Sequence, residues 1–371
     1  MRNALRRLLG MRQRDTWLVL VVLAIGLLAL PFMTDALLGR GWVRILDFTL
    51  LYIMLALGLN IVVGYAGLLD LGYIAFFAVG AYCYALLGSP QLGLHFPFWV
   101  ILPLSALLAC LFGVLLGAPT LRLRGDYLAI VTLGFGEIIR IFLNNLNSPI
   151  NITNGPQGIG MIDPIHLGSF SLGSTHKLFG LTLPPVHLHY YLFLFFTLLV
   201  IFVSLRLEGS RIGRAWMAIR EDEIAAKAMG INTRNIKLLA FAMGATFGGL
   251  AGGLFAGFQG FVSPESFGLA ESITVLCMVV LGGMGNISGV LLGCLLLVVL
   301  PEVLRHGSGP AQQLLFGRSF VDPESLRMLL FGLALIVVML WRPAGLWPSR
   351  QHRSELTAKD NLTKSSRDDR T

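Results

Sequence analysis

The sequence predicts an all-α protein, a polytopic helical membrane bundle of about ten (roughly eight to ten) transmembrane segments with both termini in the cytoplasm. Hydrophobic residues make up 55% of its 371 residues and charged residues only 13%. This charged fraction is about half that of a soluble domain. The apolar residues form runs of roughly 17–25, the length that crosses about 30 Å of hydrocarbon. The basic residues are clustered between these runs.

Apolar runs separated by charged or glycine-rich stretches define the predicted spans. They are residues 17–33, 45–64, 72–88, 98–118, 127–143, 189–205, 238–258, 272–284, 287–304 and 328–342.

The eighth and ninth spans come from one apolar run, 272–304, which we divide at Gly282-Gly283-Met284-Gly285-Asn286. The division gives ten segments, which place both basic ends of the chain on the cytoplasmic side, as the distribution of Lys and Arg favours. Irregular backbone at membrane depth persists only inside protein or beside a water-filled cavity. The glycine break is therefore expected inside the bundle and not against lipid.

The chain divides into three parts. A basic N-terminus, 1–16, precedes a transmembrane domain, 17–348, and a polar, charged tail, 349–371, is expected to be disordered. No small-x-small cleavage site follows the first apolar run, so we interpret that run as an uncleaved span. With the N-terminus inside, the basic segments 119–126 and 206–237 face the cytoplasm, and the acidic turn 258–271 faces outside. The segment 144–188, rich in Gly, Pro, Asn and Ser, forms an external cap or loop.

Helix packing is predicted by glycines at a spacing of four. Gly244, Gly248 and Gly252 lie on one face of the span 238–258. Small residues at this spacing let helix backbones approach closely in lipid.

Composition and motifs exclude several function classes. The net charge of +8 does not indicate a nucleic-acid-binding protein, because the basic residues flank the spans. The four cysteines lie in apolar segments without metal-ligand spacing, so we predict no metal site. The chain has no Gly-x-x-x-x-Gly-Lys-Ser/Thr phosphate loop and no catalytic constellation. It is therefore not expected to be an enzyme or to need a cofactor, and an ATPase that drove it would have to be another chain.

The cytoplasmic segment 206–237 is the most informative part of the chain. Between Arg214 and Met229 it has no glycine or proline, and its alanines and charged residues favour helix. Acidic residues at 221–223 mark the start of a second, short helix, and Gly230 is expected to end it. Such a helix is marginal alone in water, so its apolar side needs a surface to dock against. A solvated loop between two spans is the alternative.

This segment resembles the EAA-x-x-x-G loop of ABC-importer permeases, in which a short helix docks on the ATP-binding subunit. The match is Ala225-Ala226-x-x-x-Gly230. Ile224 stands where the family has glutamate, and Glu223 lies one residue earlier. This departure fits the amino-acid and sugar permease branch. Four further stretches, 60–82, 121–140, 154–159 and 281–286, resemble the LivM-type permeases of the branched-chain amino acid ABC importers.

The resemblance implies a permease subunit that forms the translocation path of an ATP-driven importer for leucine, isoleucine and valine in the bacterial inner membrane. Its implied partners are a sister permease in a heterodimer, two cytoplasmic subunits that bind the ATP, and a periplasmic amino-acid-binding protein. The implied ATPase-coupling residues are Glu221, Glu223, Ile224, Ala225, Ala226 and Gly230.

The substrate path of such a permease needs transient polar contacts for a zwitterion and an apolar lining. Glu137 and Arg140 lie three residues apart on one span and are expected to pair with each other, an interpretation preferred over substrate contact. Asp70 is expected to cap the helix of the third span. The candidate path residues are Asn60, Gly64, Gly67, Asp70, Gly134, Gly136, Glu137, Gly282, Gly283, Gly285 and Asn286.

Two other functions remain open at this point. An ion-coupled secondary carrier would use Glu137 and Asp70 as proton or sodium groups and the glycine breaks as discontinuous helices, but it leaves 206–237 unexplained. An ABC permease for another small polar solute, such as a sugar, an amide or urea, would share the architecture.

Overall fold

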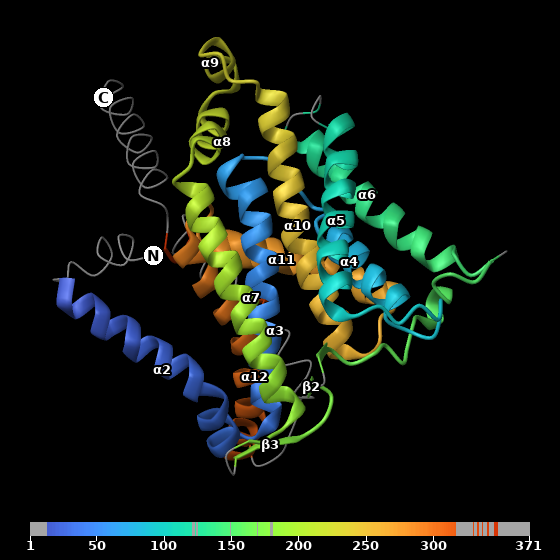
Figure 1. The fold of residues 1–371 in the computed structure, drawn as a ribbon. Coiled ribbons are helices and arrows are strands. Elements are labelled where there is room, and N and C mark those ends of the chain that lie inside the picture. Colours follow the sequence, from blue (N-terminus) through green and yellow to red (C-terminus); the bar gives the residue numbers. More distant parts are fainter. Residues whose placement is uncertain are drawn as a thin grey trace.

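The computed structural model describes residues 13–316 except 121, 122, 124, 149, 169, 179 and 180, and also residues 329, 332, 333, 336, 340 and 345–347. Helices dominate it (Figure 1). Their bounds are α2 Gln13–Leu38, α3 Arg40–Leu59, α4 Ile74–Leu87, α5 Phe98–Thr120, α6 Asp126–Asn145, α7 Pro185–Glu208, α8 Arg211–Glu221, α9 Glu223–Ala228, α10 Thr233–Gln259, α11 Leu269–Gly282 and α12 Ile287–Phe316. A π-helix η1, Asn60–Tyr65, continues α3, and the 3-10 turns are η2, Gly155–Gln157, and η3, Pro264–Phe267.

Helices occupy each of the first nine predicted spans. Among the described residues, six helices are long and apolar enough to cross a membrane. These are Arg40–Tyr65, Phe98–Thr120, Pro185–Glu208, Thr233–Gln259, Pro264–Gly282 and Ile287–His306, with shorter apolar helices at Ala24–Leu38 and Ile74–Leu87. The total of about ten spans stays a prediction. The tail 349–371 lies outside the described residues, as do most of the tenth span and most of the N-terminus 1–16.

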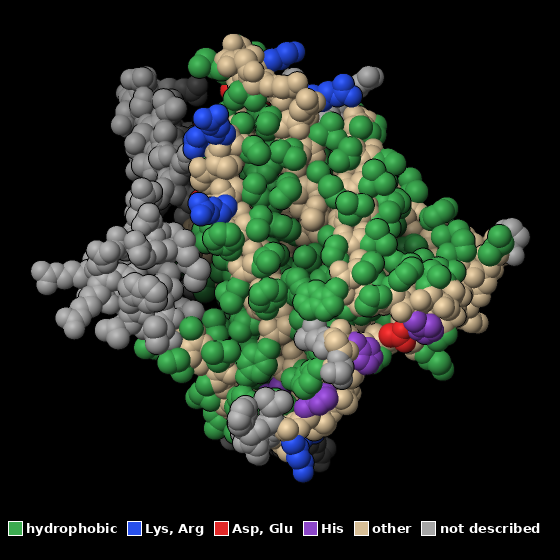
Figure 2. All heavy atoms as spheres, viewed as in Figure 1, with side chains coloured by type: hydrophobic (Ala, Val, Ile, Leu, Met, Phe, Trp, Pro, Cys, Tyr) green, Lys and Arg blue, Asp and Glu red, His purple; other side chains and the backbone are tan. Residues whose placement is uncertain are grey.

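The outer surface agrees with a lipid environment. Figure 2 shows hydrophobic side chains spread over α5, α6, α7 and α10, while most Lys and Arg on this face gather toward the end that holds α8 and α9. On α5 the exposed side chains include Leu107, Leu111 and Leu115. Bands of exposed leucine are costly in water but favourable against hydrocarbon.

The two ends of the bundle differ. The segment 206–237 and the junction between α5 and α6 lie at one end, whereas 146–184 and the turn after α10 lie toward the other (Figure 1). Residues Ile159 and Val262 join these last two segments in an antiparallel bridge. This separation matches the predicted sidedness, in which 119–126 and 206–237 share one face and 144–188 and 258–271 share the opposite face.

The all-α prediction missed two small β-hairpins in the segment 144–188. Strands β1, His166–Leu167, and β2, Phe170–Ser171, pair antiparallel, as do β3, His176–Leu178, and β4, Leu181–Leu183. Gly168, between the first pair, has a φ of 66°, which suits a tight hairpin turn. Strands of two or three residues are too short to show an alternating pattern in the sequence.

Helix α10 lies at the centre of the bundle and packs on α5, α4 and α3. Its glycines allow this approach, as predicted. A Cβ atom at Gly249 would lie 2.6 Å from the Ser105 carbonyl oxygen and would overlap the methyl group of Ala109 on α5. On the next face, a Cβ at Gly252 would overlap the Phe77 carbonyl of α4. The small residues thus bring the helix backbones into direct contact.

A Gly249→Val variant is expected to unfold about 5 °C or more below the wild type in detergent, because forcing a side chain between two backbones costs roughly 1–3 kcal/mol or more. Gly26→Val on α2 is the matched control. Nothing lies within 4 Å of a Cβ at Gly26, so its melting temperature should stay close to that of the wild type. Equal melting temperatures for the two variants would show that the α10–α5 contact is not tight.

The predicted division of 272–304 is confirmed. Helix α11 ends at Gly282 and α12 begins at Ile287. Between them Gly283 and Gly285 have φ values of 119° and 79°, a conformation that favours glycine. Gly282 and Gly283 are buried, so the break lies within the protein, as expected of irregular backbone at membrane depth.

Candidate functional site

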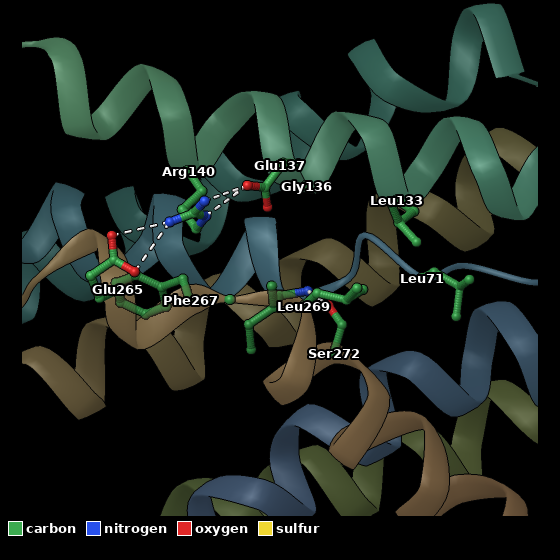
Figure 3. Close-up of a pocket in the computed structure, with 11 residues that line it drawn as sticks. Leu71, Leu133, Gly136, Glu137, Arg140, Glu265, Phe267, Leu269 and Ser272 are labelled. Atoms are coloured by element: carbon green, nitrogen blue, oxygen red, sulfur yellow. Dashed lines mark hydrogen bonds and ion pairs between the residues drawn. The ribbon is translucent and has the colours of Figure 1, made fainter.

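A cavity of about 490 Å³ lies between α6 and the η3–α11 segment. Figure 3 shows α6 on one side of it, with Arg140, Glu137 and Leu133, and Glu265, Phe267, Leu269 and Ser272 facing them. The start of α4 and the turn before it also line the cavity. Its lining residues are Leu71, Ile74, Leu133, Gly136, Glu137, Arg140, Glu265, Phe267, Gly268, Leu269 and Ser272.

Three charged side chains form a cluster on the cavity wall. The Arg140 Nε atom donates to Oε1 of Glu137 at 3.0 Å, which confirms the predicted pair. Arg140 Nη1 also donates to Glu265 Oε1 at 3.1 Å and Oε2 at 3.2 Å. Glu265 therefore joins the cluster from η3, far away in the sequence, and Asn144 Nδ2 donates to the same carboxylate at 3.2 Å.

The rest of the cavity is largely apolar. Leu71, Leu133 and Phe267 line it together with Ile74 and Leu269. A guanidinium group can bind a carboxylate through two parallel hydrogen bonds, and carboxylates can accept from an ammonium group. An aliphatic wall beside such a cluster is chemically suited to a zwitterion with a branched apolar side chain.

The backbone of α6 lies directly against the backbone of the turn before α4, and this contact shapes the cavity wall. A Cβ at Gly136 would lie 3.1 Å from the Cα atom of Gly72, and a Cβ at Gly72 would overlap the Thr132 carbonyl of α6. Gly134, by contrast, has open space around the position of a Cβ. Gly136 is thus needed for packing of α6 on the turn before α4.

The prediction that Asp70 caps the third span is wrong. Helix α4 begins at Ile74, and its N-cap residue, Tyr73, makes no side-chain capping bond. Asp70 Oδ1 accepts instead from the Gly72 amide at 2.9 Å, while the Leu71 amide donates to Thr132 Oγ1 at 3.1 Å. A short acidic side chain readily captures the amide two residues later. Asp70 therefore holds the turn that packs against α6.

A second group of predicted path residues meets away from the cavity lining. Asn60 Oδ1, at the start of η1, accepts from the Gly285 amide at 2.9 Å. A Cβ at Gly64 would lie 2.6 Å from that same amide nitrogen. Asn286 Nδ2 donates to the Trp347 carbonyl at 2.9 Å. Asn60, Gly64 and the 282–286 break therefore contact one another, and Gly67 lies in the turn that follows η1. Gly136 and Glu137 lie elsewhere, in the lining of the cavity.

The segment 206–237 contains two helices, as predicted. Ser210 Oγ caps α8 by accepting from the Gly213 amide at 3.1 Å. Asp222 Oδ1 caps α9 by accepting from the amides of Ile224 at 2.7 Å and Ala225 at 3.1 Å. Gly230, with a φ of 84°, follows the end of α9. The Gly230 and Ile231 amides donate to the carbonyls of Lys227 and Ala226, a Schellman motif that ends the helix.

Helix α9 is anchored on one side and exposed on the other. Ala226 is buried, and Glu223 Oε1 forms an ion pair with Lys237 Nζ of α10 at 2.7 Å. Ile224 and Met229 are 72% and 84% exposed, and Glu221, Ala225 and Gly230 are also exposed. The Trp216 Nε1 atom donates to the Ile236 carbonyl at 2.7 Å and fixes α8 against α10.

Comparison with known proteins decides the family. Residues 41–339 match the family model described as the permease component of the branched-chain amino acid transport system. The chain belongs to this family. It is 46% identical over 359 residues to the high-affinity branched-chain amino acid transport permease LivM of Escherichia coli K12, covering 94% of this chain and 78% of that protein.

More distant relatives carry similar descriptions. A probable branched-chain amino acid transport permease LivM of Methanocaldococcus jannaschii is 29% identical, over 67% of this chain and 69% of its own length. The LivH permease of Salmonella typhimurium is 24% identical, over 80% of this chain and 90% of its own length. No solved structure gives a significant match. As a family member, the chain is a permease component of a branched-chain amino acid transport system.

The sequence did not single out Glu265. It follows the turn after α10, and only its acidic character within the segment 258–271, predicted to be external, was visible. Its pairing with Arg140 depends on the packing of η3 against α6, a contact between residues 125 positions apart. Single-sequence patterns carry no signal for such a contact.

Proposed function

We propose that this chain is one transmembrane permease subunit of an ATP-driven importer that carries leucine, isoleucine and valine across the bacterial inner membrane. One structural observation supports the ATP-driven class most strongly. Helix α9 is a capped six-residue helix at one end of the bundle with Ile224 and Met229 in solvent. Exposed apolar side chains on a rigid, capped helix favour insertion into an apolar cleft of another protein.

The partner proposed for α9 is a separate cytoplasmic ATP-binding subunit. The basic residues around α8 and α9 support a cytoplasmic location. The sequence has no phosphate loop, so ATP would bind to two partner subunits and no cofactor to this chain. The proposed coupling residues are Glu221, Glu223, Ile224, Ala225, Ala226 and Gly230, of which Ala226 is buried and anchors the helix.

Two further partners complete the proposal. The match to a permease named LivH supports a sister permease of similar fold, and hence a heterodimer. A periplasmic amino-acid-binding protein would supply affinity, since a permease that held its substrate tightly would oppose release. The structured segment 144–188, at the end of the bundle away from α9, is the surface available to such a receptor.

For substrate passage we propose the cavity beside Arg140. Its guanidinium would contact the substrate carboxylate, Glu137 and Glu265 would contact the ammonium group, and the leucine-rich wall would contact the side chain. Ion pairs of this kind, half exposed, contribute little to stability. Their groups can therefore exchange partners at small cost when a zwitterion enters.

An ion-coupled carrier is the alternative class, with Glu137 and Asp70 as the coupling groups. The pairing of Glu137 with Arg140 disfavours it, because a carboxylate held by a guanidinium is a poor proton acceptor near neutral pH. The carrier also assigns no role to the exposed apolar face of α9.

Glu265→Gln is expected to raise the KM for leucine uptake about two- to fivefold with little change in maximal rate, because one exposed charge contact is worth roughly 0.2–1 kcal/mol. Glu302→Gln removes a comparable Glu–Arg pair on α12 and serves as the control. Initial uptake rates over a range of leucine concentrations measure both variants. An unchanged KM in Glu265→Gln would remove that residue from the path.

Substrate competition tests the proposed function. Leucine uptake by cells that carry the complete importer should be blocked by excess isoleucine or valine but not by ribose or urea, and should vanish when this chain is deleted. Competition by ribose or urea without competition by isoleucine would instead identify a permease for another polar solute.

A further inference from the structure

Arg220, near the end of α8, lies against the π-helix that continues α3. Its Nη1 atom donates a hydrogen bond to the Gly64 carbonyl oxygen in η1. Its side-chain stem packs on the turn that follows, where a Cβ at Gly67 would lie 2.7 Å from Arg220 Cγ. Gly67 has a φ of 68°, so both its conformation and its missing side chain suit this contact.

The same guanidinium also reaches the break between α11 and α12. A Cβ at Gly285 would lie 3.2 Å from Arg220 Nη1. The Gly285 amide in turn donates to Asn60 Oδ1, one turn before Gly64. Arg220 therefore lies where the end of α3, the turn at Gly67 and the glycine break meet.

The local backbone explains why a cation is suited to this place. Gly64 is near the end of a helix, where carbonyl groups lack partners within the helix and carry partial negative charge. Irregular backbone at membrane depth needs a polar partner from the protein. A guanidinium bound to the Gly64 carbonyl meets both requirements, and π-helical turns are frequent at functional sites.

Arg220 is also tied closely to α9. It lies two residues before Asp222, whose side chain caps α9 through the Ile224 and Ala225 amides. Because only one residue separates Arg220 from Asp222, the two residues cannot move far relative to each other. A displacement of α9 by a bound partner would therefore also displace the Arg220 backbone. The Arg220 side chain thus connects the segment that carries α9 to the π-helix η1 and to the break between α11 and α12.

We infer that Arg220 is a positioning residue that links the ATPase-docking helix α9 to the π-helix η1 and the α11–α12 break, so that movement of α9 changes the arrangement of these two irregular segments. The inference rests on the proposed function, since it assumes an ATPase bound to α9. It adds to that function the physical connection between hydrolysis and the membrane-embedded path.

The test compares coupling in the complete importer, purified with its companion subunits and reconstituted in proteoliposomes with leucine as the probe. Arg220→Gln removes the charge and shortens the side chain, and Arg220→Lys keeps the charge. Arg44→Gln is the matched control, because Arg44 Nη2 also joins two helices, by a hydrogen bond to Gln259 Oε1 at 2.9 Å, but at the beginning of α3. ATP hydrolysis and leucine uptake are measured on the same vesicles.

We expect Arg220→Gln to keep its ATPase subunits and to hydrolyse ATP, while leucine taken up per ATP falls about tenfold, the factor for loss of one hydrogen bond from a charged donor. Arg220→Lys should keep part of the wild-type ratio of leucine taken up per ATP. Arg44→Gln should keep the full wild-type ratio. An unchanged ratio in Arg220→Gln, or loss of the ATPase subunits from it, would overturn the inference. If wild-type vesicles fail to take up leucine with ATP, the proposed function itself fails.

Discussion

An Ile224→Asp/Met229→Asp double variant is expected to lose its ATP-binding subunits on purification, with affinity reduced by about hundredfold or more. Loss of a hot-spot side chain at the centre of an interface costs roughly 2 kcal/mol or more, and a buried unpaired carboxylate adds a further cost. Because both side chains are largely exposed in this subunit, the substitutions should leave its own fold intact. Co-purification of the ATPase subunits with the tagged permease measures the effect.

Met161→Asp is the control for this experiment. Met161 is 85% exposed and lies in the segment 146–184 at the other end of the bundle, so it matches Met229 in residue type and exposure. It should retain the ATPase subunits. Full retention by the double variant would show that α9 is a solvated loop helix and not the docking element.

Arg140→Gln is expected to lower leucine uptake roughly 10- to 100-fold while the ATPase subunits remain bound. The range corresponds to loss of hydrogen bonds from a charged donor, about 1.5–3 kcal/mol. The Arg140 and Glu137 side chains are partly exposed, so their pairing contributes little to stability and the variant should fold. Uptake and co-purification, measured on the same preparation, separate transport from assembly.

A charge swap distinguishes substrate contact from a purely structural pair. The double variant Glu137→Arg/Arg140→Glu keeps opposite charges three residues apart on α6 but exchanges their positions relative to Glu265. A structural role confined to the Glu137–Arg140 pair should be restored by the swap, and uptake with it. If the cluster contacts the zwitterion, uptake should remain low, so recovery to the wild-type rate would contradict the proposed path.

Local signals predicted the elements that depend on neighbouring residues. The acidic residues 221–223 predicted where α9 begins, and Gly230 predicted where it ends. In the structure Asp222 caps the start of α9, and Gly230 follows its end with a positive φ. The same holds for the division between α11 and α12, where consecutive glycines interrupt an apolar run. Capping and helix breaking are short-range effects, so one sequence is enough to predict them.

Contacts between distant segments were not predictable in this way. Arg220 looked like one of several basic residues in a cytoplasmic segment, yet its partner Gly64 is 156 positions away. Glu265 was likewise only an external acidic residue. Asp70 was misassigned because a carboxylate before a helix can cap it or can bind a nearer amide, and the packing of the turn on Thr132 favours the second arrangement.

The central claim is that this chain conducts leucine at the expense of ATP hydrolysed by separate subunits. It is tested most directly by leucine uptake into proteoliposomes that hold the complete importer, with the receptor on one side and ATP on the other, in the presence and absence of an ionophore. We predict uptake that requires ATP and the ATPase pair and that persists when the ionophore dissipates ion gradients. Uptake that continues without the ATPase pair and collapses with the ionophore would contradict the claim and identify an ion-coupled carrier.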